Sequence, residues 1–101
     1  MTNIDGQWRC VQQSPMGEKT STLNLHTIAE GRFGGTNVND DGSLEFFDGE
    51  IDGNKVKFKL KLTKPLPTLL KTEAVLIGDV FEGETTIGIF GRYSIKATRT
   101  R

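Results

Sequence analysis

Residues 55–62 read KVKFKLKL, and this strict alternation of lysine with an apolar residue decides the fold class. Successive side chains of a β-strand point to opposite faces, so a period of two places the four apolar residues on one face and the four lysines on the other. The segment is therefore predicted to be a strand with one buried face and one solvated face.

The spacing of the glycines extends this prediction to the whole chain. The 101 residues contain 12 glycines, most of them at short intervals, which argues against amphipathic helices. Apolar residues alternate between these glycines, and the chain is predicted to be a single all-β domain over residues 1–101. The predicted strands lie at about residues 6–13, 19–28, 32–38, 43–48, 55–63, 68–77, 79–87 and 90–99.

The connections between these strands are short. Glu30-Gly31, Asp41-Gly42 and Gly78-Asp79 tolerate the positive φ angles that tight hairpin turns require. A chain of hairpins is a meander, and with eight strands the first lies beside the last in the antiparallel sense needed for pairing. We therefore expect an eight-stranded antiparallel up-and-down meander barrel.

Residues near both ends of the chain resemble the calycin pattern. Gly6-Gln7-Trp8 begins the first predicted strand and Arg99 ends the last, which resembles lipocalins, fatty-acid-binding proteins and avidins, where an arginine packs across a tryptophan. The resemblance implies a calycin-like barrel plugged at one end by Trp8 and Arg99, with Arg101 as an alternative partner of the same parity. Residues 5–8, 31–36 and 49–54 also resemble segments of small bacterial β domains without an assigned activity.

The inward side chains are predicted to fill most of the interior. An eight-stranded barrel has the size at which side chains either fill the interior or leave room for one small molecule. We expect a filled core or a shallow mouth instead of a deep cup. The predicted inward residues are Trp8, Leu23, Leu25, Phe33, Leu44, Phe46, Val56, Phe58, Leu60, Leu62, Phe81, Tyr93 and Ile95. The strand at 68–77 stays ambiguous, because Leu70, Ala74 and Leu76 compete with Leu69, Val75 and Ile77 for the inward face.

Alternate connections of a meander lie at opposite ends of the barrel, and the two predicted ends differ in chemistry. One end receives the polar turns near residues 29–31, 49–54 and 78–79 together with both termini. Apolar residues of the other four connections are predicted to ring a mouth, and they are Met16, Leu66, Ile89 and Phe90. Exposed apolar side chains at a rim indicate contact with a ligand or partner. The alternative is that they fold over the barrel end as a cap.

Charge and composition favour neither nucleic acid nor a membrane as partner. Lys plus Arg and Asp plus Glu number 13 each, so no net field attracts polyanions or an anionic surface. The longest apolar run, residues 74–77, is far shorter than the roughly 20 residues of a membrane helix. Cys10 is the only cysteine, and the polar start lacks the features of a signal peptide, so a cytoplasmic location is expected.

Residues 48–54, DGEIDGN, imitate the start of a calcium-binding loop. The twelfth position is Lys59, where such a loop needs a bidentate glutamate, so a hairpin turn is favoured. The acidic residues of segment 40–52 are instead expected to meet the lysines of segment 55–71 across paired strands. No metal site and no cofactor are predicted.

Each catalytic candidate has a simpler structural interpretation. His26, the only histidine, alternates with the inward Leu25 and is expected on the solvated face. Cys10 shares the parity of Trp8 and is expected to be an inert buried thiol. No serine lies in a Gly-x-Ser-x-Gly motif. The sequence therefore predicts no catalytic residue.

Three functional hypotheses follow, because a fold does not by itself determine a function. The first is a non-catalytic barrel module that binds a small apolar ligand or a protein segment at the predicted mouth. The second is a structural homodimer without a ligand. The third is an isomerase- or cyclase-type enzyme that uses Tyr93, Arg99 or His26. The dimer would use an outward apolar stripe made of Val11, Val38, Phe47, Val75 and Ile87.

Overall fold

Eight strands and one short helical turn make up the described chain. The computed structural model describes residues 4–40, 42–62 and 67–101. Across these ranges no helix is long and apolar enough to cross a membrane. The elements are β1 (Gly6–Ser14), β2 (Gly17–Ala29), β3 (Arg32–Asn39), β4 (Gly42–Asp52), β5 (Lys55–Leu62), β6 (Thr68–Ile77), β7 (Val80–Ile87), the 3₁₀ turn η1 (Gly88–Phe90) and β8 (Arg92–Arg99).

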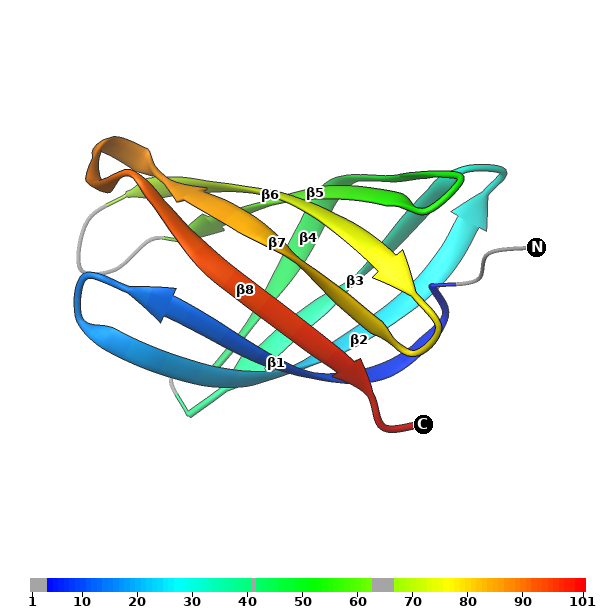
Figure 1. The fold of residues 1–101 in the computed structure, drawn as a ribbon, viewed down its shortest axis with the longest axis horizontal. Helices are drawn as coiled ribbons and strands as arrows, with labels where there is room; N and C mark the ends of the chain where they lie inside the picture. Colours follow the sequence, from blue (N-terminus) through cyan, green and yellow to red (C-terminus); the bar gives the residue numbers. More distant parts are fainter. Residues whose placement is uncertain (1–3, 41, 63–66) are drawn as a thin grey trace.

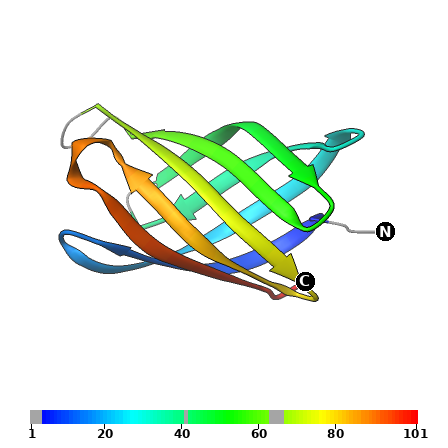
Figure 2. The same cartoon turned by 45° about the horizontal axis from the view of Figure 1, so that its top comes forward.

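The strands form a closed barrel (Figures 1 and 2). Each strand pairs antiparallel with the next, and β1 pairs antiparallel with β8, from Trp8 opposite Arg99 to Gln12 opposite Ile95. Closure pairs the backbone groups that an open sheet would expose at its edges. The prediction of an all-β, eight-stranded up-and-down meander barrel is confirmed.

Alternation places the apolar residues on the inner face. In β5, Val56, Phe58 and Leu60 are buried. In β6, Ala74 and Leu76 are buried, whereas the competing Leu69, Val75 and Ile77 are exposed, which resolves the ambiguity of that strand. The core comprises Ile4, Trp8, Cys10, Leu23, Leu25, Phe33, Phe46, Val56, Phe58, Leu60, Ala74, Leu76, Phe81, Ile95 and Ala97. The remaining predicted inward residues, Leu44, Leu62 and Tyr93, are half-buried.

Aromatic rings fill the middle of the barrel around Phe58. The ring centroid of Phe58 lies 4.7 Å from that of Phe46 and 6.1 Å from those of Phe33 and Phe81. The Phe81 ring lies 4.9 Å from that of Trp8. Aromatic pairs at such distances and tilted angles contribute about 0.5–1.5 kcal/mol beyond the area that they bury. Rings from β1, β3, β4, β5 and β7 therefore occupy the space that a deep ligand cup would need.

β4 differs from the prediction because it contains a β-bulge. Its register shifts between Phe47 and Glu50 relative to β5, and Asp48 has a φ of 53°. The extra residue reverses the phase of the alternation, so that Phe46 and Gly49 are both buried. The strand consequently continues to Asp52, whereas the sequence predicted an end at residue 48 and a turn over residues 49–54.

Two predictions at the β7–β8 connection are wrong. Ile87, predicted to point outward, is buried because it shares the inward parity of Phe81 and Thr85. β8 begins at Arg92 instead of residue 90, because residues 88–90 form η1 and Gly91 has a φ of 98°. This connection is therefore a helical turn and not the start of a strand.

Opposite charges face each other across β4 and β5 on the outer wall. Glu50 is opposite Lys57, and Lys59 Nζ lies 3.3 Å from Asp48 Oδ2. Exposed pairs of this kind contribute only about 0.2–1 kcal/mol each. They do favour the observed register, which places acidic residues of β4 opposite lysines of β5. The predicted meeting of the acidic and basic segments is confirmed.

Two inner-face glycines allow neighbouring strands to approach closely. A Cβ atom on Gly35 would lie closer than 3.0 Å to the backbone oxygen of Asn24, and one on Gly83 would do the same at Glu73. Glycine inside a strand commonly marks such a close approach or a bend in a barrel wall. The narrow closure of the barrel therefore depends on the absence of side chains at these positions.

We expect Gly83→Ala to lower the free energy of unfolding by about 3 kcal/mol, because the added methyl group forces β6 and β7 apart. Gly34 provides a matched control, since a Cβ there would come no closer than 3.7 Å to any atom outside its chain neighbours. Gly34→Ala should change the free energy by less than about 0.5 kcal/mol. Urea denaturation of both variants measures the difference, and equal effects would contradict the close-approach explanation.

Candidate functional site

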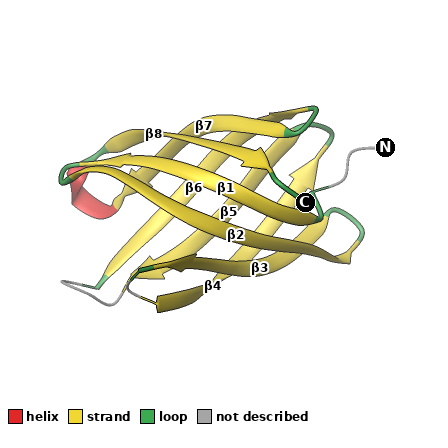
Figure 3. Cartoon of the chain, turned by 90° about the horizontal axis from the view of Figure 1, so that it is seen from below, coloured by secondary structure: helices red, strands yellow, loops and turns green. Residues whose placement is uncertain are grey.

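The connections give the barrel two different ends (Figures 1 and 3). The plug end carries the β2–β3, β4–β5 and β6–β7 turns, together with Ile4 and Arg101 at the two ends of the described chain. The mouth end carries the β1–β2, β3–β4, β5–β6 and β7–β8 connections, the last of which contains η1. Because aromatic rings occupy the middle of the barrel, a ligand or partner can approach the interior from these two ends.

Arg99 stacks on Trp8 at the plug end. Its guanidinium carbon lies 4.5 Å from the centroid of the Trp8 ring, which is within the range of a cation–π interaction. Arg99 Nε donates a hydrogen bond to Asp79 Oδ1 at 2.7 Å, and Nη1 donates to the carbonyl of Asp5. Trp8 Nε1 donates to the carbonyl of Ile4 at 3.0 Å. The structure thus brings the two predicted plug residues together.

The segment before β1 closes the same end, which the sequence analysis did not predict. Ile4 is buried in the core, and Asp5 Oδ1 accepts hydrogen bonds from the Thr27 backbone nitrogen at 2.5 Å and its hydroxyl at 2.6 Å. Arg101 contributes its backbone carbonyl, which accepts from Gln7 N at 3.0 Å. Arg99 and not Arg101 is therefore the stacked arginine.

Arg99→Lys tests the stack on Trp8. Lysine keeps the positive charge but lacks the planar fork that covers the ring and donates in two directions, so we expect a loss of about 1–2 kcal/mol in the free energy of unfolding. Trp8 is the only tryptophan, so its fluorescence reports the change directly. Arg92 is the control, because its side chain is 73% exposed and lies 3.8 Å from Glu84. Arg92→Lys should cost less than about 0.5 kcal/mol, and similar losses in both variants would count against the stack.

The predicted mouth residues that the structure describes are exposed at the mouth end. Met16 in the β1–β2 turn is 77% exposed, and Ile89 and Phe90 in η1 are 96% and 50% exposed. Leu66, the fourth predicted residue, lies outside the described residues. The exposure of Met16 and Ile89 argues against the alternative in which these side chains fold over the barrel end as a cap.

A small cavity lies inside the mouth end. Its volume is about 50 Å³, and its apolar walls include Leu23, Phe46, Phe58 and Leu60. Polar residues of four strands complete the lining, namely Gln12, Ser21, Asn37 and Thr72. These four residues were not predicted to face inward, although each shares the parity of an inward residue on its own strand. The interior therefore changes from apolar at the plug end to partly polar at the mouth end.

Most of the polar groups near the cavity already have partners. Gln12 Nε2 donates to the carbonyl of Gln13 at 2.7 Å and to that of Ser94 at 3.1 Å. The hydroxyls of Thr72 and Thr85 lie 2.9 Å apart and bond to each other. The exception is Asn37, whose Oδ1 is buried and has no hydrogen-bond partner within the described part of the chain. Asn37 thus lines the cavity, and its buried oxygen lacks a partner among the described residues.

Cys10 lines the same cavity but is not a nucleophile at neutral pH. Burial raises the pKa of its thiol from 9.0 to about 11, and a hydrogen bond with Ser21 offsets part of this increase. A nucleophilic cysteine needs the opposite shift, which keeps the thiolate populated near pH 7. The structure places Cys10 where the sequence predicted it, on the inner face and buried.

The raised pKa of Cys10 predicts a pH-dependent loss of stability. The unfolded chain ionises this thiol at a lower pH than the folded protein, so the thiol's contribution is complete below about pH 9 and disappears as the pH rises to about 11. Two pKa units correspond to roughly 2–3 kcal/mol. We therefore expect the free energy of unfolding of the wild type to fall relative to that of Cys10→Ala over this window. Parallel profiles of the two proteins in denaturant titrations would contradict the prediction.

The residues of the enzyme hypothesis are not brought together. His26 is exposed on the outer face of β2, and Arg99 belongs to the plug end. Tyr93 is half-buried near the start of β8, six residues or roughly 20 Å along the strand from Arg99. In the described ranges, no group of three or more His, Cys, Asp or Glu residues is arranged to hold a metal ion.

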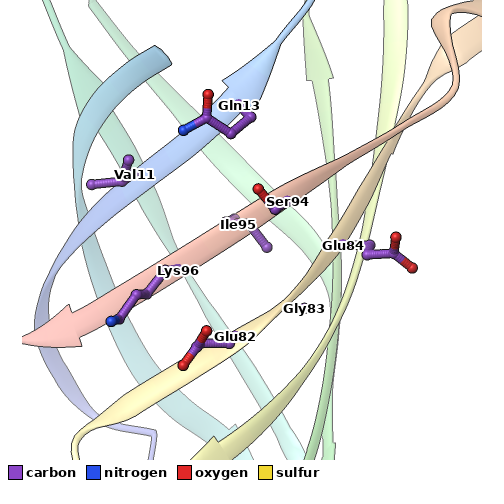
Figure 4. A pocket seen from close by; sticks show the side chains of 8 residues that line it. All are labelled: Val11, Gln13, Glu82, Gly83, Glu84, Ser94, Ile95 and Lys96. Atoms are coloured by element: carbon purple, nitrogen blue, oxygen red, sulfur yellow. The ribbon is translucent and has the colours of Figure 1, made fainter.

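A larger but open groove runs over the outer wall of β1, β8 and β7 (Figure 4). Its volume is about 570 Å³, and its lining includes Val11 and Gln13 from β1, Lys96 from β8, and Glu82 and Glu84 from β7. The three charged side chains are exposed. An open surface with solvated charges of both signs neither encloses a ligand nor removes it from water. We therefore assign the candidate site to the mouth end.

The apolar stripe predicted for a dimer does not form a single face. Val11, Val38, Phe47 and Val75 lie on β1, β3, β4 and β6, and are distributed around the closed barrel. Ile87, the fifth residue, is buried inside. Dimerisation stays a prediction, but this set of residues does not supply a continuous interface for it.

No protein-family model matches the chain, and none of the curated proteins matches it either. The function is therefore inferred from the geometry of the barrel itself.

Proposed function

We propose that this protein is a non-catalytic binding module that engages a protein segment at the mouth end of its barrel. The supporting observation is that exposed apolar residues and a small cavity occur together at that end. Met16 and Ile89 are exposed to solvent on two separate connections. Burying an aliphatic side chain of this size gains about 1.5–3 kcal/mol, so a partner that covers both gains a substantial part of its binding free energy there.

The size of the cavity favours a protein segment over a small apolar ligand. Sites for small molecules commonly enclose about 300–1,000 Å³, whereas this cavity has about 50 Å³. Only one small group can enter, so the bulk of any ligand must lie outside, over Met16, Ile89 and Phe90. A polypeptide meets both conditions, because one side chain can enter the cavity while its neighbours cover the rim.

The proposal includes a calycin-like classification of the barrel, on the support of the Arg99–Trp8 stack and the pairing of β1 with β8. It also takes residues 1–101 as one domain, since the first and last strands belong to the same barrel. A cytoplasmic location is part of the proposal, because a buried, unpaired Cys10 suits a reducing compartment.

Peptide display against the immobilised protein tests the proposal. We expect one family of peptides to be enriched, and the triple variant Met16→Glu, Ile89→Glu, Phe90→Glu to bind it at least about tenfold more weakly, because charge replaces the apolar contact. The matched control is Ile28→Glu with Ile77→Glu, two residues near the plug end that are 63% and 74% exposed. This control should bind the peptides like the wild type.

Three other outcomes would overturn the proposal. The first is an absence of enriched peptides, or peptides that bind the mouth variant as tightly as the wild type. The second is saturable binding of a fluorescent fatty acid that the mouth substitutions abolish, which would identify a small apolar ligand. The third is a dimer of the wild type that the same substitutions dissociate, which would identify a second copy of the chain as the occupant.

A further inference from the structure

The pairing of β1 with β8 stops before either strand reaches the mouth end. The last paired residues are Gln12 and Ile95, whereas β1 continues to Ser14 and β8 begins at Arg92. Two residues of β1 and three of β8 therefore lie beyond the last pair. In this short stretch the barrel wall has two strand edges instead of a continuous ladder, and such edges can pair with another chain.

The even-numbered residues of β8 direct their backbone groups towards β1. Thr100 N, directly after β8, donates to the carbonyl of Gln7 in β1 at 2.7 Å, whereas Arg99 N donates on the other side, to the carbonyl of Asp79. Successive residues of an antiparallel strand alternate between its two neighbours in this way. The registers of β8 with β1 and β7 contain no shift, so the alternation continues to the start of β8.

A side chain takes the place of the ladder where the pairing stops. Gln12 Nε2 donates to the carbonyl of Gln13 at 2.7 Å and to that of Ser94 at 3.1 Å, and these are the two residues that would form the next pair. Pro15 follows Gln13 on the same side of the chain and has no backbone N–H to donate. The edge of β8 is therefore the better one for pairing, because Arg92 and Ser94 have backbone groups that face β1 and both residues are exposed.

The surface beside this edge has room for another chain. The groove of about 570 Å³ is lined by Gln13 of β1 and Ser94 of β8 (Figure 4). Met16 lies two residues beyond the end of β1, and Phe90 two residues before the start of β8, so apolar residues of the mouth adjoin both edges. An added strand does not need an enclosed pocket, because backbone hydrogen bonds provide much of its affinity.

The side chains of β8 favour an acidic residue next to an apolar one in the added strand. The outward residues at this end of β8 are Arg92 and Ser94, followed by Lys96, and none of them is acidic. Arg92 is 73% exposed although Glu84 of β7 lies 3.8 Å from it, so a carboxylate directly opposite on the β1 side adds a second partner. Tyr93 is half-buried with inward parity, and an apolar residue suits the position opposite it.

We propose that the protein segment of the proposed function binds as an extended strand along residues 92–94 of β8. Its backbone N–H and C=O groups bond to those of Arg92 and Ser94. An acidic residue of the segment lies opposite Arg92, and the neighbouring apolar residue lies opposite Tyr93. This inference rests on the proposed function, to which it adds the conformation and the chemistry of the bound segment.

Amide hydrogen exchange in the free protein, followed by NMR, tests whether the edge of β8 is open. We expect the amides of Arg92 and Ser94 to exchange at least about tenfold faster than those of Lys96 and Thr98. The latter two also face β1 but lie within the paired stretch. Tyr93 pairs with β7 and should exchange slowly, which distinguishes an open edge from fraying of the strand. Equal protection of Ser94 and Lys96, or fast exchange of Tyr93, would overturn the inference.

Ser94→Pro tests the role of the edge in binding. Proline removes the N–H that faces β1 and leaves the hydrogen bonds of β8 to β7 in place. We expect the variant to bind the peptides enriched by display at least about tenfold more weakly than the wild type. Ser94→Ala keeps the N–H and is the matched control, which should bind like the wild type. If Ser94→Pro does not fold, N-methylation of the same peptides at single positions decides on the wild type, and only alternate positions should weaken binding.

The outcomes separate this inference from the proposed function. Enriched peptides that need Met16 and Ile89 but bind Ser94→Pro as tightly as the wild type support the proposed function and overturn the strand pairing. Enriched peptides without an acidic residue overturn the assigned chemistry of the segment. A dimer of the wild type that Ser94→Pro dissociates identifies a second copy of the chain at the edge and also overturns the inference. An absence of enriched peptides overturns the proposed function and this inference together.

Discussion

The pairing between β1 and β8 joins the first and the last strand of the meander. All the other strand pairs join strands that follow one another in the sequence. The β1–β8 pairing runs from Trp8 opposite Arg99 to Gln12 opposite Ile95, and it closes a loop of almost the whole chain, with the corresponding loss of conformational entropy. The stack of Arg99 on Trp8 and its hydrogen bond to the carbonyl of Asp5 reinforce this same junction. An inside and an outside of the sheet exist only because the junction forms.

The closed barrel is narrow, and its interior is used differently along its length. Near the plug end the inner face of β1 carries Trp8, and that of β7 carries Phe81. Towards the mouth end the same faces carry Gln12 and Thr85. Polar groups inside a core are costly unless they are fully paired, and the pairs around Thr72 and Gln12 meet that condition. Asn37 does not, because its buried Oδ1 has no partner within the described part of the chain.

Much of the fold was predictable from alternation alone, because one face of each strand is buried. Where both faces of a strand are apolar, as in β6, the alternation does not determine which face is buried. Only pairing with the neighbouring strands decides that Ala74 faces inward and Val75 outward. The bulge at Asp48 was not predictable, since an inserted residue breaks the very period on which the prediction depends. The outward prediction for Ile87 was wrong for a different reason. Its parity matches that of the inward Phe81, so the sequence itself indicated an inward position.

The candidate site was predictable only in part. Hydropathy located Met16, Ile89 and Phe90 at one end, because large apolar side chains stand out in polar turns. The cavity was not predicted, because polar residues at inward positions near the end of a strand are usually solvent-exposed. Only the closure of the barrel encloses them. Ser21 and Asn37 share the parity of Leu23 and Phe33, so a search for polar residues at inward positions would have found them.

Both ends of the described chain lie at the plug end, where Ile4 is buried and the carbonyl of Arg101 bonds to Gln7. Any polypeptide joined to either end leaves the barrel from the side opposite the mouth. A neighbouring domain or a sensor surface attached at either end therefore lies next to the plug end, and the mouth stays on the opposite side of the barrel.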